Sequence, residues 1–333
     1  MKILTSKLIL PLLFLLVLDL KELDAGNIFN TCKGQNATAT VNQRLNKGKE
    51  RMKNEEEIGE EVFNKIHVYG FQELDESDTS QHQTRECSCG IKFKVGEVNV
   101  LLELKKGVEP TKLIVTKEPI YNGKKGTVKI YHAKWPEENR CVAIKFLIKS
   151  NSESKDAANK EIKVLEYFYG SGKNTKIDGP IRIVEYFGHE SKTMQNGLAV
   201  ESIVVELGRM NLLQYYIGIT NMKHANVAKQ LRRILISAAE ALEQFHERGF
   251  VHLDIKSENF VSTHARDQNN NSIFKLIDFG TSERIENEDF KVLSNEVLGT
   301  DVYMAPELNF ESSTVWVKLF SFVYNIGVVV HCL

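Results

Sequence analysis

Three short segments in the second half of the chain constrain its fold more than any other feature. In chain order they are residues 252–259 (HLDIKSEN), 275–280 (KLIDFG) and 299–307 (GTDVYMAPE). The first segment places Asp254, Lys256 and Asn259 in one predicted loop. A phosphoryl-transfer site needs such a set: a carboxylate to orient a hydroxyl nucleophile, a cation beside the moving phosphoryl group, and an amide oxygen for Mg²⁺.

The pattern of apolar residues upstream predicts strands first and helices later. Strands are expected at 113–115, 128–130, 141–146, 181–186 and 202–205, and helices at 157–169 and 227–248. Alternating apolar residues from Ile91 to Leu104 predict a hairpin before them. This order indicates a small sheet lobe followed by a mostly helical lobe.

Together these features resemble the eukaryotic protein kinase superfamily, of the serine/threonine type. The resemblance covers roughly residues 111–333 and implies an α+β, two-lobed protein-kinase-like fold, with a small antiparallel sheet lobe and a mostly helical large lobe. It stops early, because Phe320–Leu333 resembles the central helix of the large lobe, where the chain ends. The large lobe is therefore expected to be incomplete. Phe322 also stands where the family has an aspartate that braces the catalytic loop.

The resemblance assigns the catalytic roles residue by residue. Asp254 would orient the substrate hydroxyl and accept its proton, and Lys256 would neutralise charge on the γ-phosphate. Asn259 and Asp278 would hold Mg²⁺. Thr300 would hydrogen-bond to the aspartate and the lysine, as in serine/threonine kinases rather than tyrosine kinases.

The resemblance also places ATP. Lys145 would contact the α- and β-phosphates and pair with Glu161, with Glu166 as the rival partner. The phosphate-covering loop has Tyr121 in place of the family's first glycine. The other expected nucleotide contacts are Gly123, Gly126, Val128 and Ala143, Val205 at the back of the adenine pocket, and Glu206, Leu207 and Gly208 in the hinge.

Two functions remain open from the sequence. The first is a protein kinase that uses ATP and Mg²⁺ to phosphorylate serine or threonine in a protein substrate. The second is a secreted pseudokinase or binding module with little or no catalysis, which the tyrosine at 121, the phenylalanine at 322 and the early stop favour. An uncovered C-terminal helix would expose apolar side chains, so a partner that covers it is expected. The net charge of −1 does not favour nucleic-acid binding.

The N-terminus has the pattern of a signal peptide, with Lys2 and Lys7 before an apolar run at 8–18 and a candidate cleavage site after Ala25. The expected organisation is therefore a leader at 1–25, a partly disordered extension at 26–110 and the kinase-like domain at 111–333. The mature protein is expected to be secreted without a membrane anchor, acting in the secretory lumen or after delivery into another cell.

Secretion would allow disulfides in the extension. Cys32 could pair with Cys87 or Cys89 in an oxidising compartment. The run Cys87-Ser88-Cys89 has no second cysteine pair and no nearby set of histidines in the sequence, so a zinc site is not expected there.

Overall fold

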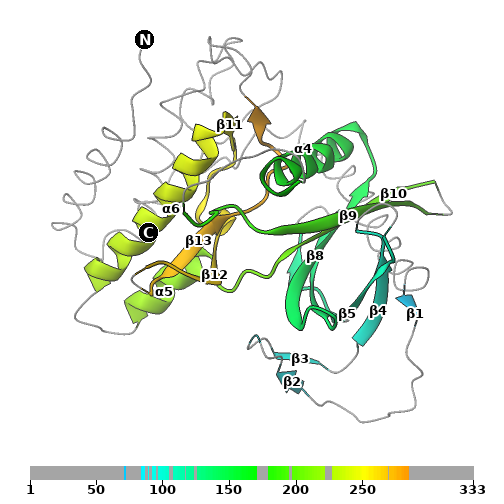
Figure 1. The fold of residues 1–333 in the computed structure, drawn as a ribbon, viewed down its shortest axis with the longest axis horizontal. Coiled ribbons are helices and arrows are strands. Elements are labelled where there is room, and N and C mark those ends of the chain that lie inside the picture. Colours follow the sequence, from blue (N-terminus) through cyan, green and yellow to red (C-terminus); the bar gives the residue numbers. More distant parts are fainter. Residues whose placement is uncertain are drawn as a thin grey trace, which may run out of the picture. The chain divides into compact units, whose positions relative to one another are not determined.

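The structure is a computed structural model that forms two compact units. It describes residues 97–104, 108–116, 118–123, 126–170, 179–194, 197–221, 227–268 and 270–284, together with 71–72, 84–86, 89 and 92–94. Among these residues, the sheet unit comprises those from 71 to 170 and those from 185 to 207. The helical unit comprises those in 179–184 and 208–284. Figure 1 shows the elements of both units.

An eight-stranded antiparallel sheet forms the sheet unit, in the order β1-β4-β5-β7-β8-β10-β9, with β6 paired to β7. Its strands are β1 (Phe71–Gln72), β4 (Glu97–Leu102), β5 (Thr111–Thr116), β6 (Tyr121–Asn122), β7 (Val128–Trp135), β8 (Arg140–Lys149), β9 (Tyr186–Thr193) and β10 (Ala199–Glu206). A separate hairpin joins β2 (Thr84–Glu86) to β3 (Lys92–Lys94).

The two faces of β8 have different environments, because successive side chains of a strand point to opposite faces. Val142, Ile144, Phe146 and Ile148 belong to the main apolar core, together with Leu113 and Val115 of β5 and other buried side chains of the sheet. Cys141, Ala143 and Lys145 alternate with them and therefore lie on the opposite face. This second face carries the nucleotide contacts expected from the sequence.

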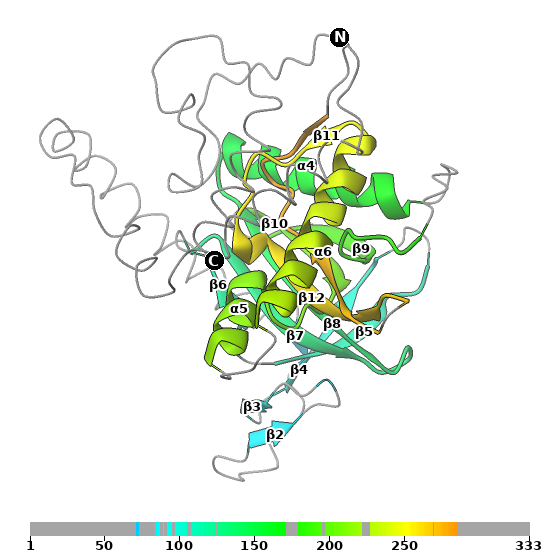
Figure 2. The same cartoon turned by 90° about the vertical axis from the view of Figure 1, so that its left-hand side faces the viewer.

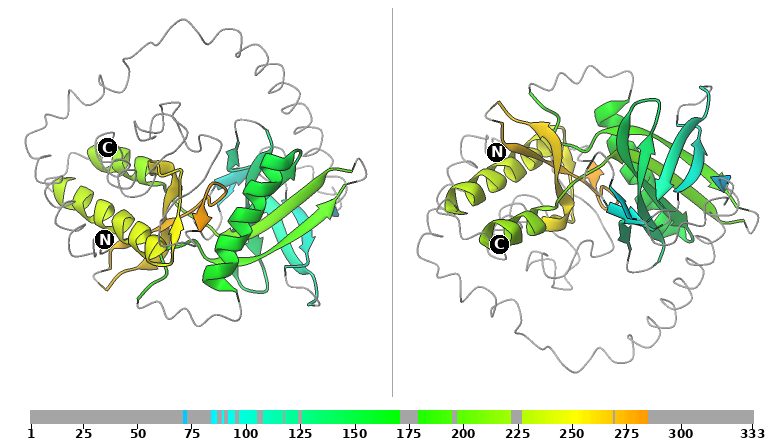
Figure 3. Two further views of the ribbon diagram at one scale, coloured as in Figure 1. Left: turned by 90° about the horizontal axis from the view of Figure 1, so that it is seen from above. Right: turned by 90° about the horizontal axis from the view of Figure 1, so that it is seen from below.

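Helix α4 (Ser152–Tyr169) lies across β8, as Figure 3 shows. Asn151 caps its N-terminus: its side chain accepts a hydrogen bond from the Ser154 backbone N–H, and the Ser154 hydroxyl group lies 3.1 Å from the Asn151 nitrogen. The helix buries Ile162, Leu165 and other apolar residues on one side. It therefore starts five residues earlier than the apolar periodicity alone predicted.

Among its described residues, the helical unit combines two α-helices and one 3₁₀ helix with two antiparallel sheets of two strands each. Its elements are α5 (Leu212–Asn221), α6 (Val227–Glu247), β11 (Phe250–Val251), the 3₁₀ helix η1 (Ser257–Asn259), β12 (Phe260–Arg266), β13 (Ser272–Leu276) and β14 (Glu283–Arg284). Helix α6 packs along α5 and β13 (Figure 2), and its buried face is rich in alanine. The Ser237 hydroxyl oxygen on this face accepts hydrogen bonds from the Phe274 N–H and the Arg182 guanidinium.

Most predicted elements are confirmed, but two are wrong. The alternating run from Ile91 to Leu104 does not fold into one hairpin, because β3 pairs with β2 whereas β4 pairs with β1 and β5. The strand expected at 181–186 is reduced to a single bridge between Ile183 and Leu276, and β9 begins at Tyr186. Ile183 and Val184 are buried without belonging to a sheet.

Several predictions concern residues outside those that the structure describes. They are the leader at 1–25, most of the extension, Cys32 and Cys87, Thr300, Phe322 and the helix expected at 320–333. Within the described part of the chain, none of the helices is long and apolar enough to cross a membrane.

Candidate active site

The loop after β11 gathers the three polar residues that the sequence singled out. Lys256 donates a hydrogen bond from Nζ to Oδ2 of Asp254 at 2.6 Å. The Asn259 side-chain amide donates to the backbone carbonyl of Asp254 at 2.8 Å and lies 3.4 Å from its Oδ2. Carboxylate, cation and amide thus meet in one cluster, as the spacing predicted.

The charge state of Lys256 follows from this cluster. Burial by itself lowers the pKa of Lys256, but the hydrogen bond and charge of Asp254 and the charges of Asp278 and Glu258 outweigh it. The pKa of Lys256 is therefore raised above its ordinary value. The lysine is a permanent cation next to the carboxylate at neutral pH.

His252 holds this loop against the segment that contains Asp278. Its Nε2 atom is 3.0 Å from the Ile277 carbonyl oxygen, and its Nδ1 atom is 3.3 Å from the Asp254 backbone nitrogen. These contacts fit a neutral ring that donates from Nε2 and accepts at Nδ1. Burial lowers the pKa of His252, which favours this neutral form. Sequence reasoning gave His252 no role, although its place two residues before Asp254 was a usable signal.

Asp278 is placed by its neighbours on both sides. The Ile277 N–H donates to the Asn259 carbonyl oxygen at 3.0 Å, and the Phe279 ring is fully buried and stacked on Phe245. Asp278 itself adopts φ 65°, in the left-handed region. These contacts bring Asp278 next to Asn259 along paired backbone segments. An amide oxygen and a carboxylate are hard oxygen ligands, and this donor set fits Mg²⁺.

Lys145 and Glu161 form the expected ion pair within the sheet unit. Nζ of Lys145 on β8 lies 2.9 Å from Oε1 and 2.7 Å from Oε2 of Glu161 on α4. Their side chains are 12% and 6% exposed, so both charges are largely removed from water. The rival Glu166 is instead half exposed, with Oε1 4.0 Å from His189. The predicted pairing is confirmed.

Strand register brings four of the predicted nucleotide contacts onto one face of the sheet. Val205 of β10 lies directly opposite Ala143 of β8, and Val128 of β7 lies opposite Leu147, two residues beyond Lys145. Because side chains alternate, Val128, Ala143, Lys145 and Val205 share the face that is opposite to the apolar core. An apolar surface next to a buried cation can accept a base with phosphates attached.

The chain leaves β10 through the predicted hinge residues. Glu206 ends β10, and its N–H donates to the Glu185 carbonyl oxygen at 2.8 Å. Leu207 is buried in the sheet unit, whereas Gly208 begins the helical unit. A Cβ on Gly208 would lie 2.9 Å from two side-chain carbons of Val261, so only glycine fits without a shift.

The predicted phosphate-covering loop is a tight turn. The Gly123 N–H donates to the Val128 carbonyl oxygen at 2.8 Å, and the Gly126 N–H donates to the Gly123 carbonyl oxygen at 3.0 Å. Gly126 adopts φ 64°, which glycine reaches without strain. Tyr121 lies in β6 with a side chain that is 53% exposed. The tyrosine is therefore accommodated as an ordinary strand residue.

The fold and the two sets of residues define a two-lobed, protein-kinase-like protein. Comparison with known proteins gives the same answer: residues 114–333 match the model of the protein kinase domain. The chain therefore belongs to the protein kinase family.

Its relatives are serine/threonine kinases at modest identity. The chain is 37% identical to the probable serine/threonine-protein kinase fnkE of Dictyostelium discoideum, over 30% of this chain and 7% of that protein. It is 27% identical to the serine/threonine-protein kinase mph1 of Schizosaccharomyces pombe, over 56% of this chain and 24% of the relative. It is 25% identical to mitogen-activated protein kinase kinase kinase 17 of Arabidopsis thaliana, over 56% of this chain and 43% of that protein. The matched regions span less than half of each of these relatives.

Proposed function

We propose that the protein transfers the γ-phosphate of ATP to serine or threonine hydroxyl groups of a protein substrate, with Mg²⁺ as cofactor. The observation that carries this proposal is the assembled cluster of Asp254, Lys256 and Asn259, with Lys256 held 2.6 Å from the Asp254 carboxylate. The resemblance of the chain to serine/threonine kinases supports the type of acceptor.

Each residue in this proposal has a role that its surroundings permit. Asp254 would orient the acceptor hydroxyl and take its proton, and the cationic Lys256 would stabilise negative charge on the transferred group. Asn259 and Asp278 would hold Mg²⁺, which neutralises phosphate charge when bound. In the sheet unit, Lys145 would be held by Glu161 in a position to bind the α- and β-phosphates.

The alternative is a kinase-derived binding module with little catalysis. Among the described residues, its strongest support is Tyr121, which stands where the family's phosphate-covering loop has its first glycine. The tyrosine points to solvent and imposes no positive φ on the backbone, which weakens this support. We therefore favour the active enzyme.

A phosphorylation assay separates the two functions. The purified chain is incubated with γ-phosphate-labelled ATP, Mg²⁺ and serine- or threonine-containing peptides, beside Asp254→Asn and Lys145→Met. Loss of the general base should lower the rate by about 10²-fold or more. Asp156→Asn, which removes an exposed carboxylate on α4, is the matched control. Equal incorporation by the wild type, Asp254→Asn and Lys145→Met would overturn the kinase proposal.

We also propose that the protein is secreted. The apolar run at 8–18 supports cleavage after Ala25 and passage into the secretory lumen or another cell. Sequencing the N-terminus of the mature protein tests it, and a chain that retains Met1 would contradict it. A protein partner at residues 320–333 is proposed from their apolar sequence, and affinity purification with and without this segment is the test.

A further inference from the structure

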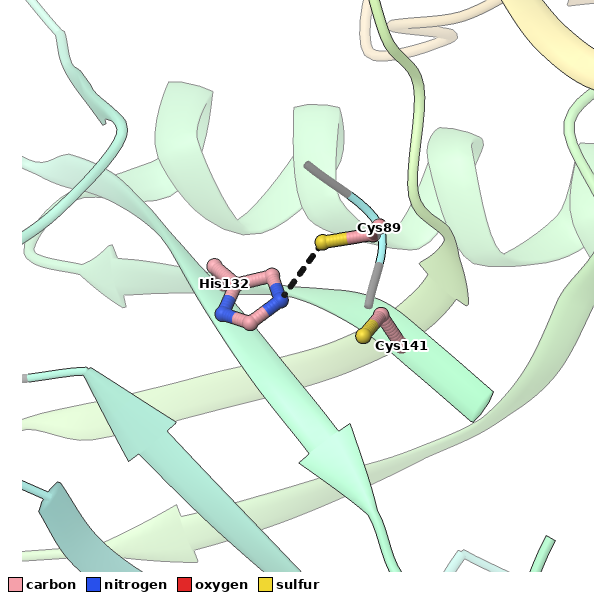
Figure 4. A group of neighbouring side chains, drawn as sticks. All are labelled: Cys89, His132 and Cys141. Atoms are coloured by element: carbon pink, nitrogen blue, oxygen red, sulfur yellow. Dashed lines mark hydrogen bonds between the residues drawn. The ribbon is translucent and has the colours of Figure 1, made fainter. Parts of the chain in front are cut away.

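Three side chains with metal-binding atoms meet in the sheet unit, on the face of the sheet that also carries Lys145. They are Cys89, His132 and Cys141, whose ligand atoms all lie within 4.8 Å of one another. Sγ of Cys89 is 3.4 Å from Nε2 of His132. Figure 4 shows the two sulfur atoms and the imidazole nitrogen gathered around one point.

The sheet register explains why two of these residues meet. His132 of β7 lies opposite Ala143 of β8, so Cys141, two residues earlier on β8, is its diagonal neighbour on the same face. Cys89 comes from elsewhere: it lies in the turn of the β2–β3 hairpin, between Glu86 and Lys92. The cluster therefore connects the hairpin to two central strands of the kinase sheet.

The distances suit a tetrahedral zinc ion. With Zn–S of about 2.3 Å and Zn–N of about 2.0–2.1 Å, tetrahedral angles put ligand sulfur and nitrogen about 3.5 Å apart and two sulfurs about 3.8 Å apart. The Cys89–His132 separation of 3.4 Å already agrees with the first value. The upper limit of 4.8 Å for the remaining pairs requires an adjustment of at most about 1.0 Å between the two sulfurs and about 1.3 Å between Cys141 and His132.

The chemistry of the donors agrees with the geometry. Two thiolates and an imidazole form a ligand set that is typical of zinc sites in proteins. His132 is 2% exposed, so its ring is largely held away from water, and both cysteines are partly buried.

We propose that Cys89, His132 and Cys141 bind a zinc ion that fastens the β2–β3 hairpin to the kinase sheet. The fourth position of the tetrahedron is completed by water or by a further ligand. A two-stranded hairpin is marginally stable alone, so an anchor at its turn gives it a fixed place. Local sequence spacing concealed this site, because its ligands come from three segments separated by up to 52 positions between Cys89 and Cys141.

The rival structure is a disulfide between Cys89 and Cys141, whose sulfur atoms are also close. An oxidising compartment would favour that bond. A disulfide, however, gives no role to the imidazole nitrogen that contacts the Cys89 sulfur. The metal site uses all three side chains, which is why we favour it.

The test measures metal in the full chain, purified under reducing conditions without a chelating column. Elemental analysis should find one zinc ion per chain, and His132→Asn and Cys141→Ser should each lower the zinc content at least about tenfold. His264→Asn, at an exposed histidine of β12, and Cys332→Ser remove the same ligand types elsewhere and should keep the zinc. Circular dichroism checks that each variant is folded.

A second measurement uses only the wild-type chain, so it does not depend on the folding of any variant. After removal of zinc with a chelator, added Co²⁺ should produce visible bands of a tetrahedral ion and thiolate-to-cobalt charge transfer. Folded protein that binds neither ion would overturn the proposal. So would zinc content unchanged in both ligand variants, or a disulfide-linked peptide pair containing Cys89 and Cys141 in the unreduced protein.

Discussion

The ion pair between Lys145 and Glu161 allows catalysis and stability to be separated by a double-mutant cycle. The four proteins are the wild type, Lys145→Met, Glu161→Leu and the double variant. Each single substitution leaves one charge in a site where the side chains are 12% and 6% exposed. The double variant replaces both charges with apolar side chains of similar length.

The expected magnitudes follow from the geometry. At 2.7–2.9 Å and an effective dielectric constant of about 20, the direct attraction is about 6 kcal/mol, which the cost of removing both charges from water largely offsets. Leaving one charge unpaired should therefore lower the free energy of unfolding by about 3–5 kcal/mol. The double variant should come within about 1–2 kcal/mol of the wild type, because no unpaired charge remains.

Urea unfolding followed by circular dichroism measures the stabilities, and the phosphorylation assay measures function. All three variants should be inactive if Lys145 binds phosphate, including the stable double variant. The result that would refute the reasoning is additivity, with the double variant losing the sum of the two single losses. A double variant that keeps wild-type activity would refute the assigned role of the lysine.

Three further predictions concern stability. Asn151→Ala removes the cap of α4 and should cost about 1 kcal/mol in urea unfolding, and no change would contradict the capping role. Gly188→Ala should be strongly destabilising, because the φ of Gly188 is 148° and a Cβ there would lie 2.4 Å from the Leu104 carbonyl oxygen. A Cβ on Gly218 in α5 meets open space, so Gly218→Ala should stabilise the protein by about 0.5–1 kcal/mol. Equal melting temperatures for these two variants would contradict both. The pKa of His252 is lowered in the folded chain. As the pH falls through about 6.5, the unfolded chain therefore takes up a proton at this residue while the folded chain does not. This difference should lower the stability by up to about 1.4 kcal/mol per pH unit. A melting temperature that stays constant from about pH 7 to about pH 5.5 would contradict this.

The sequence predicted those parts of the fold whose signals are local. Helix α6 was expected at 227–248 and is observed at Val227–Glu247, because its apolar face repeats with the helical period over 21 residues. Strand partners were harder to predict. Alternation at 91–104 indicates extended chain but not which strand pairs with it, and β4 pairs with β5 rather than with β3.

The side-chain clusters also differ in how far the local sequence predicts them. Asp254, Lys256 and Asn259 lie within six residues, so their cluster follows from the spacing and one 3₁₀ turn. The Lys145–Glu161 pair was also predicted, because a lysine in an apolar strand needs a partner and the next helix offered one. The meeting of Cys89 with His132 depends on tertiary packing, which no local pattern encodes.

Backbone strain at the catalytic loop has a structural explanation in the contacts around it. Leu253 and Asp278 are not glycines, yet both have positive φ, 62° and 65°, at a cost of about 1–2 kcal/mol each. Two hydrogen bonds connect the segments that contain them: the His252 ring to the Ile277 carbonyl, and the Ile277 N–H to the Asn259 carbonyl. These bonds, together with the buried Phe279 ring, leave the backbone few alternatives. The strain therefore persists because the surrounding contacts fix the backbone at Leu253 and Asp278. The same contacts position Asp254, the proposed general base, and Asp278, the proposed Mg²⁺ ligand, before any substrate arrives.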